Sequence, residues 1–426
     1  MEHRTVIIVG GGPAGLPLGP VLGGYHPHFS ESPVLRQRYP QLADYLAGVD
    51  GSLLGMDMGT LVQQGVQPVD LFRILHHPRQ KYVSPDQLAL DFRPAEPLDY
   101  LLITQEEVGG LWNNVPENLL TLSPGQWMEF AFYPLAQHVA EQQVDMADVN
   151  DLIIKRHLID YYHQIPIRFE QQQHIHINER VTRIQPHERG FLLTSQNVGT
   201  DTTHQYTCTY LVYAAGQRCH YRRLDVEGED LPFVTVNYNK AADYPGERIM
   251  LVGGGRSADW AATELFDAGK QVHYIMRQPR ERHWQLIGDS RHGLPYYTRL
   301  AQILESGDAR MEAVYETQID RIAADGRVTL DNGRPIEMDH LIKEIGATTD
   351  YSLFEGFPPL QQVEKHDPYR YQLHQIQTHP HNYESVDVPN LYMGGYLASG
   401  IGLVVIAMHG TTYAIASDIL HKEGRL

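Results

Sequence analysis

A short apolar run that ends in a cluster of glycines opens the chain. Val6 to Val9 are four apolar, mostly β-branched residues, which is typical of a buried parallel strand. Three glycines follow at the spacing G-x-G-x-x-G, which permits a tight turn, a bare backbone in front of a pyrophosphate, and close packing of the next helix on the strand. The N-terminus of that helix attracts phosphate. The residues predicted to line this dinucleotide site are Gly10, Gly12, Pro13, Ala14 and Gly15.

The same pattern recurs once, beginning at Arg248. A second apolar run, Ile249 to Val252, leads into Gly253 and Gly255, and Ala258 occupies the third position, where the fingerprint allows alanine. An internal repeat of a nucleotide-binding motif predicts two nucleotide-binding units within one α/β chain. The residues predicted to line the second site are Gly253, Gly255, Arg256, Ser257 and Ala258.

The strand predicted after the second motif, Gln271–Met276, ends without an acidic residue. An acid at that place would hydrogen-bond a ribose 2′-hydroxyl, whereas an arginine pairs with a 2′-phosphate. Arg277 stands there, with Arg280 and Arg282 close behind. The sequence therefore predicts NADPH rather than NADH at the second site.

The second strand of the first unit is delayed along the chain. Tyr25–Phe29 contains Pro27, which a central strand does not tolerate, whereas Asp99–Thr104 is an uninterrupted candidate. We therefore predict an insertion over about residues 25–98, with an amphipathic helix at Pro68–Leu75.

This delay leaves two candidates for the residue that binds the adenosine ribose of the first nucleotide. One is Glu31, seven residues after Gly24, and the other is a residue near Thr104.

The middle of the chain adds further candidates. Gly109 and Gly110 let the backbone approach a flat ring system, which Trp112 can wall with its aromatic face, and Gln126 lies in a second glycine- and tryptophan-containing segment. The spacing of apolar residues predicts a helix over Val149–His163. A β-meander is predicted from the short strands Ile175–Ile177, Val181–Ile184 and Phe191–Thr194.

Two strands end in small residues. One is Tyr206–Ala215, followed by Gly216, where small residues permit close approach of a ligand or of the crossing chain. Residues 341–349 repeat this pattern and are predicted to mark the return to the first domain. A third run, Asn390–Gly395, leads through Gly400 into a long apolar helix predicted from about Ile401 to His421, whose N-terminus favours negative charge. The cofactor residues predicted here are Gly216, Gly395 and Gly400. The predicted domains are 1–230 and 346–426 for the first nucleotide and 231–345 for the second.

Composition narrows the functional classes. A formal net charge of −18 argues against nucleic acid and anionic membranes as partners. The two cysteines, Cys208 and Cys219, have neither the spacing of a redox pair nor that of a zinc framework, and no metal site is predicted. The longest apolar run, Ile401–Met408, is too short for a membrane span, and no signal peptide fits before the first strand, so a cytoplasmic protein is expected.

Taken together, these motifs resemble those of the class B, single-component flavin-dependent monooxygenases. Within that group they are most similar to the oxidative-stress-induced growth inhibitor proteins, which share the delayed second strand, the Gly-Gly-x-Trp motif and the Gly125–Met128 segment. The resemblance implies a glutathione-reductase-like fold with two Rossmann-like domains, an NADPH domain inserted into an FAD domain, and FAD and NADPH as cofactors.

The reaction that the resemblance implies is oxygenation of a small organic substrate by dioxygen through a flavin C4a-hydroperoxide. Asn239 and Ser257 are the candidates to position the nicotinamide. The chain departs from the monooxygenase pattern after Phe233, where the usual glycine and histidine are missing, and this weakens a Baeyer–Villiger assignment most. The Gly-Asp of many relatives near the C-terminus is Gly395-Tyr396 here.

Three alternatives remain open at this point: a single-component flavin-dependent halogenase, an NADPH oxidase or reductase, and a regulatory protein that holds FAD without catalysis. The substrate and the oligomeric state, including a homodimer, are not specified by the sequence. The residues expected to line the substrate site lie in the insertion and in the 285–320 region, namely Gln285, His292, Tyr296 and Tyr297.

Overall fold

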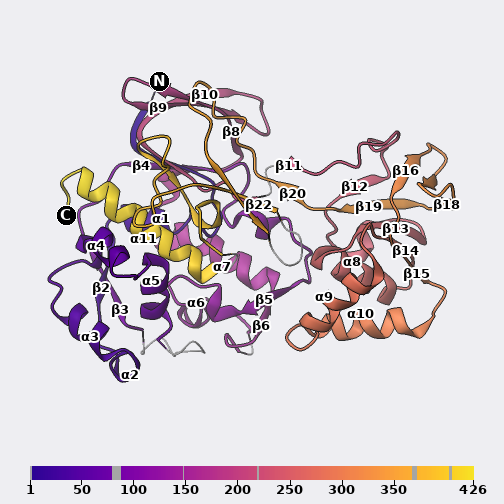
Figure 1. The fold of residues 1–426 in the computed structure, drawn as a ribbon, viewed down its shortest axis with the longest axis horizontal. Helices are drawn as coiled ribbons and strands as arrows, with labels where there is room; N and C mark the ends of the chain where they lie inside the picture. Colours follow the sequence, from indigo (N-terminus) through magenta and orange to yellow (C-terminus); the bar gives the residue numbers. More distant parts are fainter. Residues whose placement is uncertain (1, 79–87, 147, 218–219, 367–371, 403–404) are drawn as a thin grey trace.

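Two separate sheets, each built around parallel strands, form the framework of the protein (Figure 1). The computed structural model describes residues 2–78, 88–146, 148–217, 220–366, 372–402 and 405–426. The two glycine motifs follow the central strands of different sheets.

The first sheet is built around β1 (Glu2–Val9), which pairs in parallel with a strand on each side. Val6, Ile7 and Ile8 are fully buried, because both faces of this strand are covered, and this explains the uninterrupted apolar run. The parallel strands lie in the order β7 (Ile175–His176), β4 (Tyr100–Ile103), β1, β10 (Thr203–Tyr213) and β23 (Leu391–Met393).

The long strand β10 has two different neighbours on its far edge. Its first half pairs antiparallel with β9 (Gly190–Asn197), which continues the meander to β8 (Glu179–His187), while its last residues pair with β23. The meander therefore extends the sheet at the amino end of β10 and leaves the carboxyl ends of the parallel strands together.

The strands of the second sheet have a similar order around the glycine turn, except that one edge strand comes from the chain before the glycine motif. They are β15 (Met311–Val314), β14 (Gln271–Ile275), β13 (Arg248–Gly253), β19 (His340–Glu344) and β12 (Val234–Val236), all paired in parallel. One face is covered by the helices α8 (Arg256–Asp267), α9 (Arg280–Ser290) and α10 (Pro295–Ser306). The other is covered by the small antiparallel sheet of β16 (Ile319–Ile322), β17 (Arg327–Leu330) and β18 (Pro335–Glu337).

Two chain crossings connect the two sheets, and they lie side by side (Figure 1). The outward crossing contains β11 (His220–Tyr221), which pairs antiparallel with β20 (Ala347–Thr348) on the return crossing. Both chain connections between the two sheets therefore run through this short two-stranded pairing.

The segment between β1 and β4, which contains the predicted insertion, forms a layer of its own. Among the described strands, β2 (Tyr25–Phe29) pairs only with β3 (Leu90–Pro94), so Pro27 lies outside the main sheet, and β4 is the strand beside β1. The helices of this layer are α2 (Pro33–Arg38), α3 (Pro40–Ala47), α4 (Met58–Gln63) and α5 (Pro68–His76). The predictions of the strand at 99–104 and of the helix at 68–75 are confirmed.

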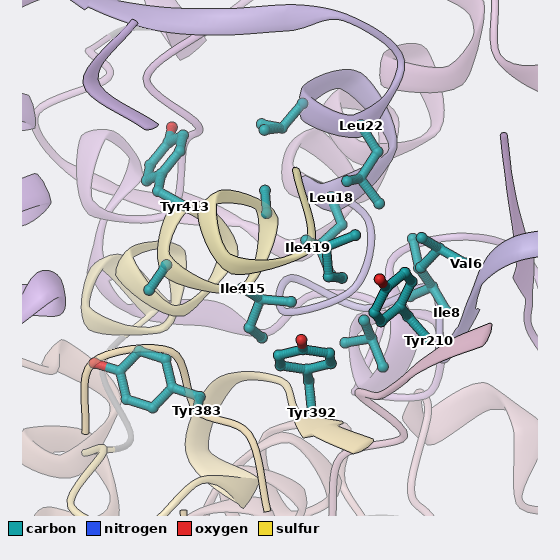
Figure 2. Packing of buried hydrophobic residues seen from close by; sticks show 14 of the residues in the cluster. Val6, Ile8, Leu18, Leu22, Tyr210, Tyr383, Tyr392, Tyr413, Ile415 and Ile419 are labelled. Carbon is teal, nitrogen blue, oxygen red and sulfur yellow. The ribbon is translucent and has the colours of Figure 1, made fainter. Parts of the chain in front are cut away.

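The last helix, α11 (Val405–Lys422), joins this layer to the first sheet. Ile415 and Ile419 pack in the same buried cluster as Val6 and Ile8 of β1 (Figure 2). On another side α11 contacts α5, where the ring of Tyr413 lies 4.3 Å from that of Phe72.

Three predicted elements differ from the structure. Only Leu18–Leu22 (α1) is helical after the first glycine turn, because Pro17 and Pro20 lack the N–H groups that a longer helix needs. The helix predicted to begin at Val149 begins at Lys155 (α7, Lys155–Arg168), because residues 152–154 form β6, which pairs with β5. The strand at Ile175 is not part of the meander, because after α7 it returns parallel to β4.

The remaining described elements complete the chain: β5 (Leu120–Pro124), β6 (Leu152–Ile154), α6 (Leu135–Gln142), β21 (Gln362–His366) and β22 (Gln372–Ile376). Among the described helices, none combines the length and the apolar character that a bilayer span requires.

The contact between α5 and α11 depends on a glycine. A Cβ atom at Gly410 would collide with the Cα of Val69, so Gly410→Ala should push the helices apart and lower the free energy of unfolding by about 1–3 kcal/mol. Gly288→Ala in α9 is the matched control, since it gains the same helix propensity and its Cβ would meet no atom within 4 Å. Chemical denaturation measures both; equal stabilities of the two variants would contradict the packing described here.

Candidate functional site: the carboxyl edges of the two sheets

The first glycine turn is held by close contacts that exclude any larger residue. Gly10 has a φ of +113°, and a Cβ there would collide with the carbonyl oxygen of Ala214 at the end of β10. A Cβ at Gly15 would collide with the carbonyl oxygen of Gly10. These two glycines therefore let the turn lie directly against the neighbouring strand.

The turn offers hydrogen-bond donors to an anion. Within the described part of the chain, the backbone N–H groups of Gly11, Gly12 and Ala14 have no hydrogen-bond partner. Successive free N–H groups in a turn form an anion-binding concavity, which suits the pyrophosphate of a dinucleotide. The residues present thus fit FAD, although the donors belong to the turn itself and not to a helix N-terminus, since α1 begins only at Leu18.

The Gly109-Gly110 loop closes over this turn. The N–H of Gly109 donates to the carbonyl oxygen of Gly11 at 2.8 Å, and a Cβ at Gly110 would lie 2.8 Å from the Cα of Gly12. A Cβ at Gly12 would point back at Gly110, 3.5 Å from its Cα. The two glycine motifs that the sequence placed at the cofactor therefore lie in direct contact.

The predicted aromatic and amide residues lie nearby, in the buried cluster beside this loop. Trp112 is 8% exposed and belongs to the same cluster as Leu16, Met128 and Tyr162. Gln126 is buried on the segment that leads into this cluster.

The return strand brings the C-terminal glycines to the same edge. The N–H of Gly394 donates to the carbonyl oxygen of Tyr213 at 2.9 Å, and the N–H of Gly395 donates to Thr411 on α11. Gly216 adopts a φ of +73°, and a Cβ there would lie 3.5 Å from the hydroxyl of Tyr396. Gly400 is exposed, with a φ of +81°.

The two candidates for the adenosine ribose are far from equivalent. Glu31 follows β2 in the inserted layer and forms an ion pair with Arg36. Near Thr104, at the end of β4, the half-buried Glu106 accepts a hydrogen bond from Asn114 at 2.5 Å, and burial raises the pKa of its carboxyl group. Glu106 is the acid that stands at the carboxyl edge of the sheet.

The second glycine turn repeats the first. A Cβ at Gly253, whose φ is +151°, would collide with the carbonyl oxygen of Glu344 at the end of β19. Gly255 is the N-cap of the twelve-residue helix α8, so Ser257 and Ala258 lie in its first turn, where N–H groups lack helical partners. This arrangement fits a second pyrophosphate.

The segment after β14 lies over the second glycine turn. The side chain of Gln278 donates to the carbonyl oxygen of Gly254 at 2.8 Å. Its neighbour Arg277 is exposed and has no ion-pair partner among the described residues, while Arg280 lies over the ring of Trp284. Arg256 donates to Ser290 at the end of α9.

Asn239 lies where the two halves meet. Its backbone oxygen accepts a hydrogen bond from the N–H of Glu117 at 3.1 Å, and Asn118 donates to Glu264 of α8 at 3.0 Å. The side chain of Asn239 donates to Asp243. The loop that follows Gly110 therefore contacts the second half at Asn239, one of the predicted nicotinamide residues, and at Glu264 of α8.

A buried carboxylate behind the second turn was missed by sequence reasoning. Asp259 of α8 is fully buried and accepts hydrogen bonds from Tyr274, His283 and Tyr297, at 2.7, 2.7 and 3.0 Å. It thus ties α8 to β14, α9 and α10. The Asp after Ser-Ala in the motif was the available signal.

The residues of the 285–320 region that were expected to line the substrate site lie in different environments. Tyr297 is fully buried and its hydroxyl is bound to Asp259, and Tyr296 is also in the core of this half. Gln285 and His292 are exposed. These four residues do not line one site, because two lie in the core of this half and two, Gln285 on α9 and His292 between α9 and α10, lie on the surface.

A second cluster that the sequence did not predict lies behind Gln126. Nε2 of His76 lies 3.1 Å from Oε1 of Glu129, and Nε2 of His77 lies 3.1 Å from the backbone oxygen of Gln126. All are buried, so burial lowers the pKa of each imidazole to about 3 and raises the pKa of Glu129 to about 7. The members are too far apart in sequence for a motif to reveal them.

Thiol chemistry has no accessible group in the described part of the chain. Cys208 is fully buried in β10, and burial raises the pKa of its thiol well above the usual value. Cys219 lies outside the described residues.

Parallel sheets with a glycine turn after a central strand define an α/β nucleotide-binding protein. The family model for the pyridine nucleotide-disulphide oxidoreductases matches residues 87–395, and the chain belongs to this family. Its cofactors confirm, at the level of the family, the prediction of FAD and NADPH.

Comparison with individual proteins agrees with the resemblance seen in the sequence. The chain is 22% identical over 319 residues to human oxidative stress-induced growth inhibitor 2, covering 64% of this chain and 62% of that protein.

Among solved structures, the bacillithiol disulfide reductase Bdr of Staphylococcus aureus matches with a TM-score of 0.65, at 18% identity over 99% of this chain and 100% of that one. A flavin-containing monooxygenase from Stenotrophomonas maltophilia matches with a TM-score of 0.55, at 14% identity over 99% of both chains. At these identities both likenesses concern the fold.

The first glycine turn gives a direct test of FAD binding. In Gly12→Val the added methyl groups enter the space between the turn and Gly110, which should displace the free N–H groups and release FAD. The measurement is the ratio of flavin to protein absorbance after purification, with Gly288→Val as the control. Full flavin content in Gly12→Val would show that the turn is not the site.

Proposed function

We propose that this protein is an NADPH-dependent FAD monooxygenase that oxygenates a small organic substrate with dioxygen. The observation that carries the proposal is the convergence of Gly10, Gly216 and Gly395 at one carboxyl edge, with a second glycine turn at the equivalent edge of the second sheet. Family membership supports the same cofactor pair.

In this proposal the two sheets form two Rossmann-like domains. The FAD domain comprises residues 1–230 and 346–426, interrupted by the inserted layer at about 25–98, and the NADPH domain comprises 231–345. The antiparallel pairing of β11 with β20 supports these boundaries, because both crossings between the sheets pass there.

Each part of the FAD site has an assigned task. The N–H groups of Gly11, Gly12 and Ala14 bind the pyrophosphate, and Glu106 binds the adenosine ribose. When bound, FAD supplies hydride acceptance and the activation of dioxygen. The buried cluster around Trp112 excludes water from the ring, which protects a reactive oxygen species from unproductive loss.

The NADPH site is assigned from the second sheet. The first turn of α8, including Ser257, binds the pyrophosphate, and Arg277 pairs with the 2′-phosphate. Asn239 and Ser257 orient the nicotinamide, which is supported by the contact of Asn239 with the loop after Gly110. The buried Asp259 network holds α9 and the arginines at its start in place.

Among the described residues, the state of the one cysteine favours oxygenation over disulfide reduction. Thiol-based disulfide reduction needs an accessible thiolate, and Cys208 is buried with a raised pKa. Reducing equivalents from NADPH therefore pass to dioxygen and substrate in this proposal.

The reaction is tested by a substrate screen of NADPH consumption under ¹⁸O₂, with mass spectrometry of the products. Incorporation of one ¹⁸O atom per NADPH consumed is the expected result. Recovery of every equivalent as hydrogen peroxide would indicate an oxidase, halogenated products with bromide present would indicate a halogenase, and failure of NADPH to reduce the flavin would indicate a regulatory protein.

Coenzyme choice gives a residue-level prediction. Arg277→Ala removes a charge-assisted contact to the 2′-phosphate, so the efficiency of flavin reduction by NADPH should fall roughly ten- to a hundred-fold while that by NADH stays nearly unchanged. The measurement is flavin reduction by both coenzymes in wild type, Arg277→Ala and the double variant with Arg280→Ala.

Arg291→Ala, another exposed arginine of the same half, is the control and should leave both coenzymes unaffected. Equal efficiency of NADPH and NADH in the wild type, or no loss in the double variant, would contradict the assignment.

A further inference from the structure

Three metal-ligand side chains meet in the interior, outside the glycine turns. His76 is the last residue of α5 and His77 is its C-cap, while Glu129 comes from the segment that follows β5. Among the described residues, His76, His77 and Glu129 form a group of three in which one ligand atom of each lies within 4.8 Å of the others. All three residues are at least 95% buried.

The hydrogen bond of His77 fixes which ring nitrogen is available. A backbone carbonyl can only accept, so Nε2 of His77 must carry the proton that it donates to Gln126 at 3.1 Å. The other nitrogen, Nδ1, then presents a lone pair in a neutral ring, and it is buried without a hydrogen-bond partner. A histidine whose distal N–H is bound to a carbonyl is the usual arrangement of a metal ligand.

The carboxylate of Glu129 also lacks a compensating cation. Its Oε2 accepts a hydrogen bond from the N–H of Leu135 at 2.7 Å, and its Oε1 faces His76. No lysine or arginine forms an ion pair with Glu129 in the described part of the chain. A buried charge is stabilised by an ion pair or by a metal ion. Two imidazoles beside the carboxylate of Glu129 provide the ligands for a metal ion.

The elements that carry the cluster are fixed by packing. α5 is pressed against α11 at Gly410 and by the ring of Phe72 on Tyr413, and the ring of His77 stacks on that of Trp127 at 5.3 Å. Ligands on packed elements keep their geometry without a bound ion.

We propose that His76, His77 and Glu129 bind one divalent transition-metal ion, with Nδ1 of His77 as a ligand. Two imidazoles and one carboxylate form a donor set that suits Zn²⁺ or Fe²⁺ and not Mg²⁺ or Ca²⁺. Metal–ligand bonds of about 2.0–2.2 Å place neighbouring ligand atoms roughly 3.4 Å apart, so the 3.1 Å separation of Nε2 of His76 from Oε1 of Glu129 needs little change. The ligand atom of His77, which lies within 4.8 Å of the other two, has to move by at most about 1.4 Å to complete the site. With three protein ligands, a fourth position stays open.

The test measures metal binding and does not depend on oxygenation. The purified holoprotein is stripped with a chelator, incubated with Zn²⁺ or Co²⁺, passed through a desalting column and analysed by inductively coupled plasma mass spectrometry. One equivalent of Zn²⁺ is expected, together with a rise in the thermal midpoint, and the Co²⁺ form should show the visible absorption bands of a four- or five-coordinate site.

Variants locate the ion. His77→Gln and Glu129→Gln should lower Zn²⁺ affinity by more than about 100-fold, since loss of an outer hydrogen bond alone costs about 10–100-fold. His138→Gln removes an equally buried imidazole from the same half and should bind like the wild type. If Glu129→Gln does not fold, the thermal midpoint provides the test. Zn²⁺ should raise the thermal midpoint of the wild type and leave that of His77→Gln unchanged.

Two results would overturn the inference: less than about a tenth of an equivalent of Zn²⁺ and Co²⁺ on the wild type, or unchanged binding in both ligand variants. The ratio of FAD to protein is recorded in parallel. Because that ratio reports the glycine turn, loss of metal with retained FAD separates this site from the proposed monooxygenase activity.

Discussion

The close approach of a glycine to the end of the neighbouring strand is the contact on which both halves of the molecule depend. In the first sheet Gly10 lies against the carbonyl of Ala214, and in the second Gly253 lies against that of Glu344. A side chain at either glycine would separate the strands where the ligand edge forms. The same constraint, met twice in one chain, places a glycine turn at the carboxyl edge of each of the two sheets.

The inserted layer between β1 and β4 is part of the same hydrophobic core as the first sheet. Its helix α5 packs tightly on α11, which in turn packs on the face of β1 (Figure 2), so the layer is fixed to the same core as the glycine turn. The C-terminal end of α5 places His76 and His77 beside the segment around Gln126, a predicted flavin residue.

In the second half of the molecule, the hydrogen bonds of Asp259 fix the helices relative to the sheet behind the second glycine turn.

The sequence was sufficient for features that depend on local patterns. Apolar runs located β1, β4, β13 and β14, and Pro27 correctly excluded β2 from the main sheet. The sequence was not sufficient where the secondary structure depends on a distant pairing partner. Residues 152–154 form a strand because they pair with β5. Residues 175–176 pair in parallel with β4 because α7 carries the chain back to that edge of the sheet. The His76–His77–Glu129 cluster was invisible because tertiary packing alone brings its two segments together.

Hydrogen–deuterium exchange of the apoprotein, followed by mass spectrometry, tests the central claim most directly. Addition of FAD should protect the backbone amides of residues 10–16, 109–112 and 214–216, and subsequent addition of NADP⁺ should protect residues 253–259 and 276–279. Two separate sets of protected amides are the predicted result. Protection of the first set by NADP⁺ alone, or absence of protection at both glycine turns, would contradict the account.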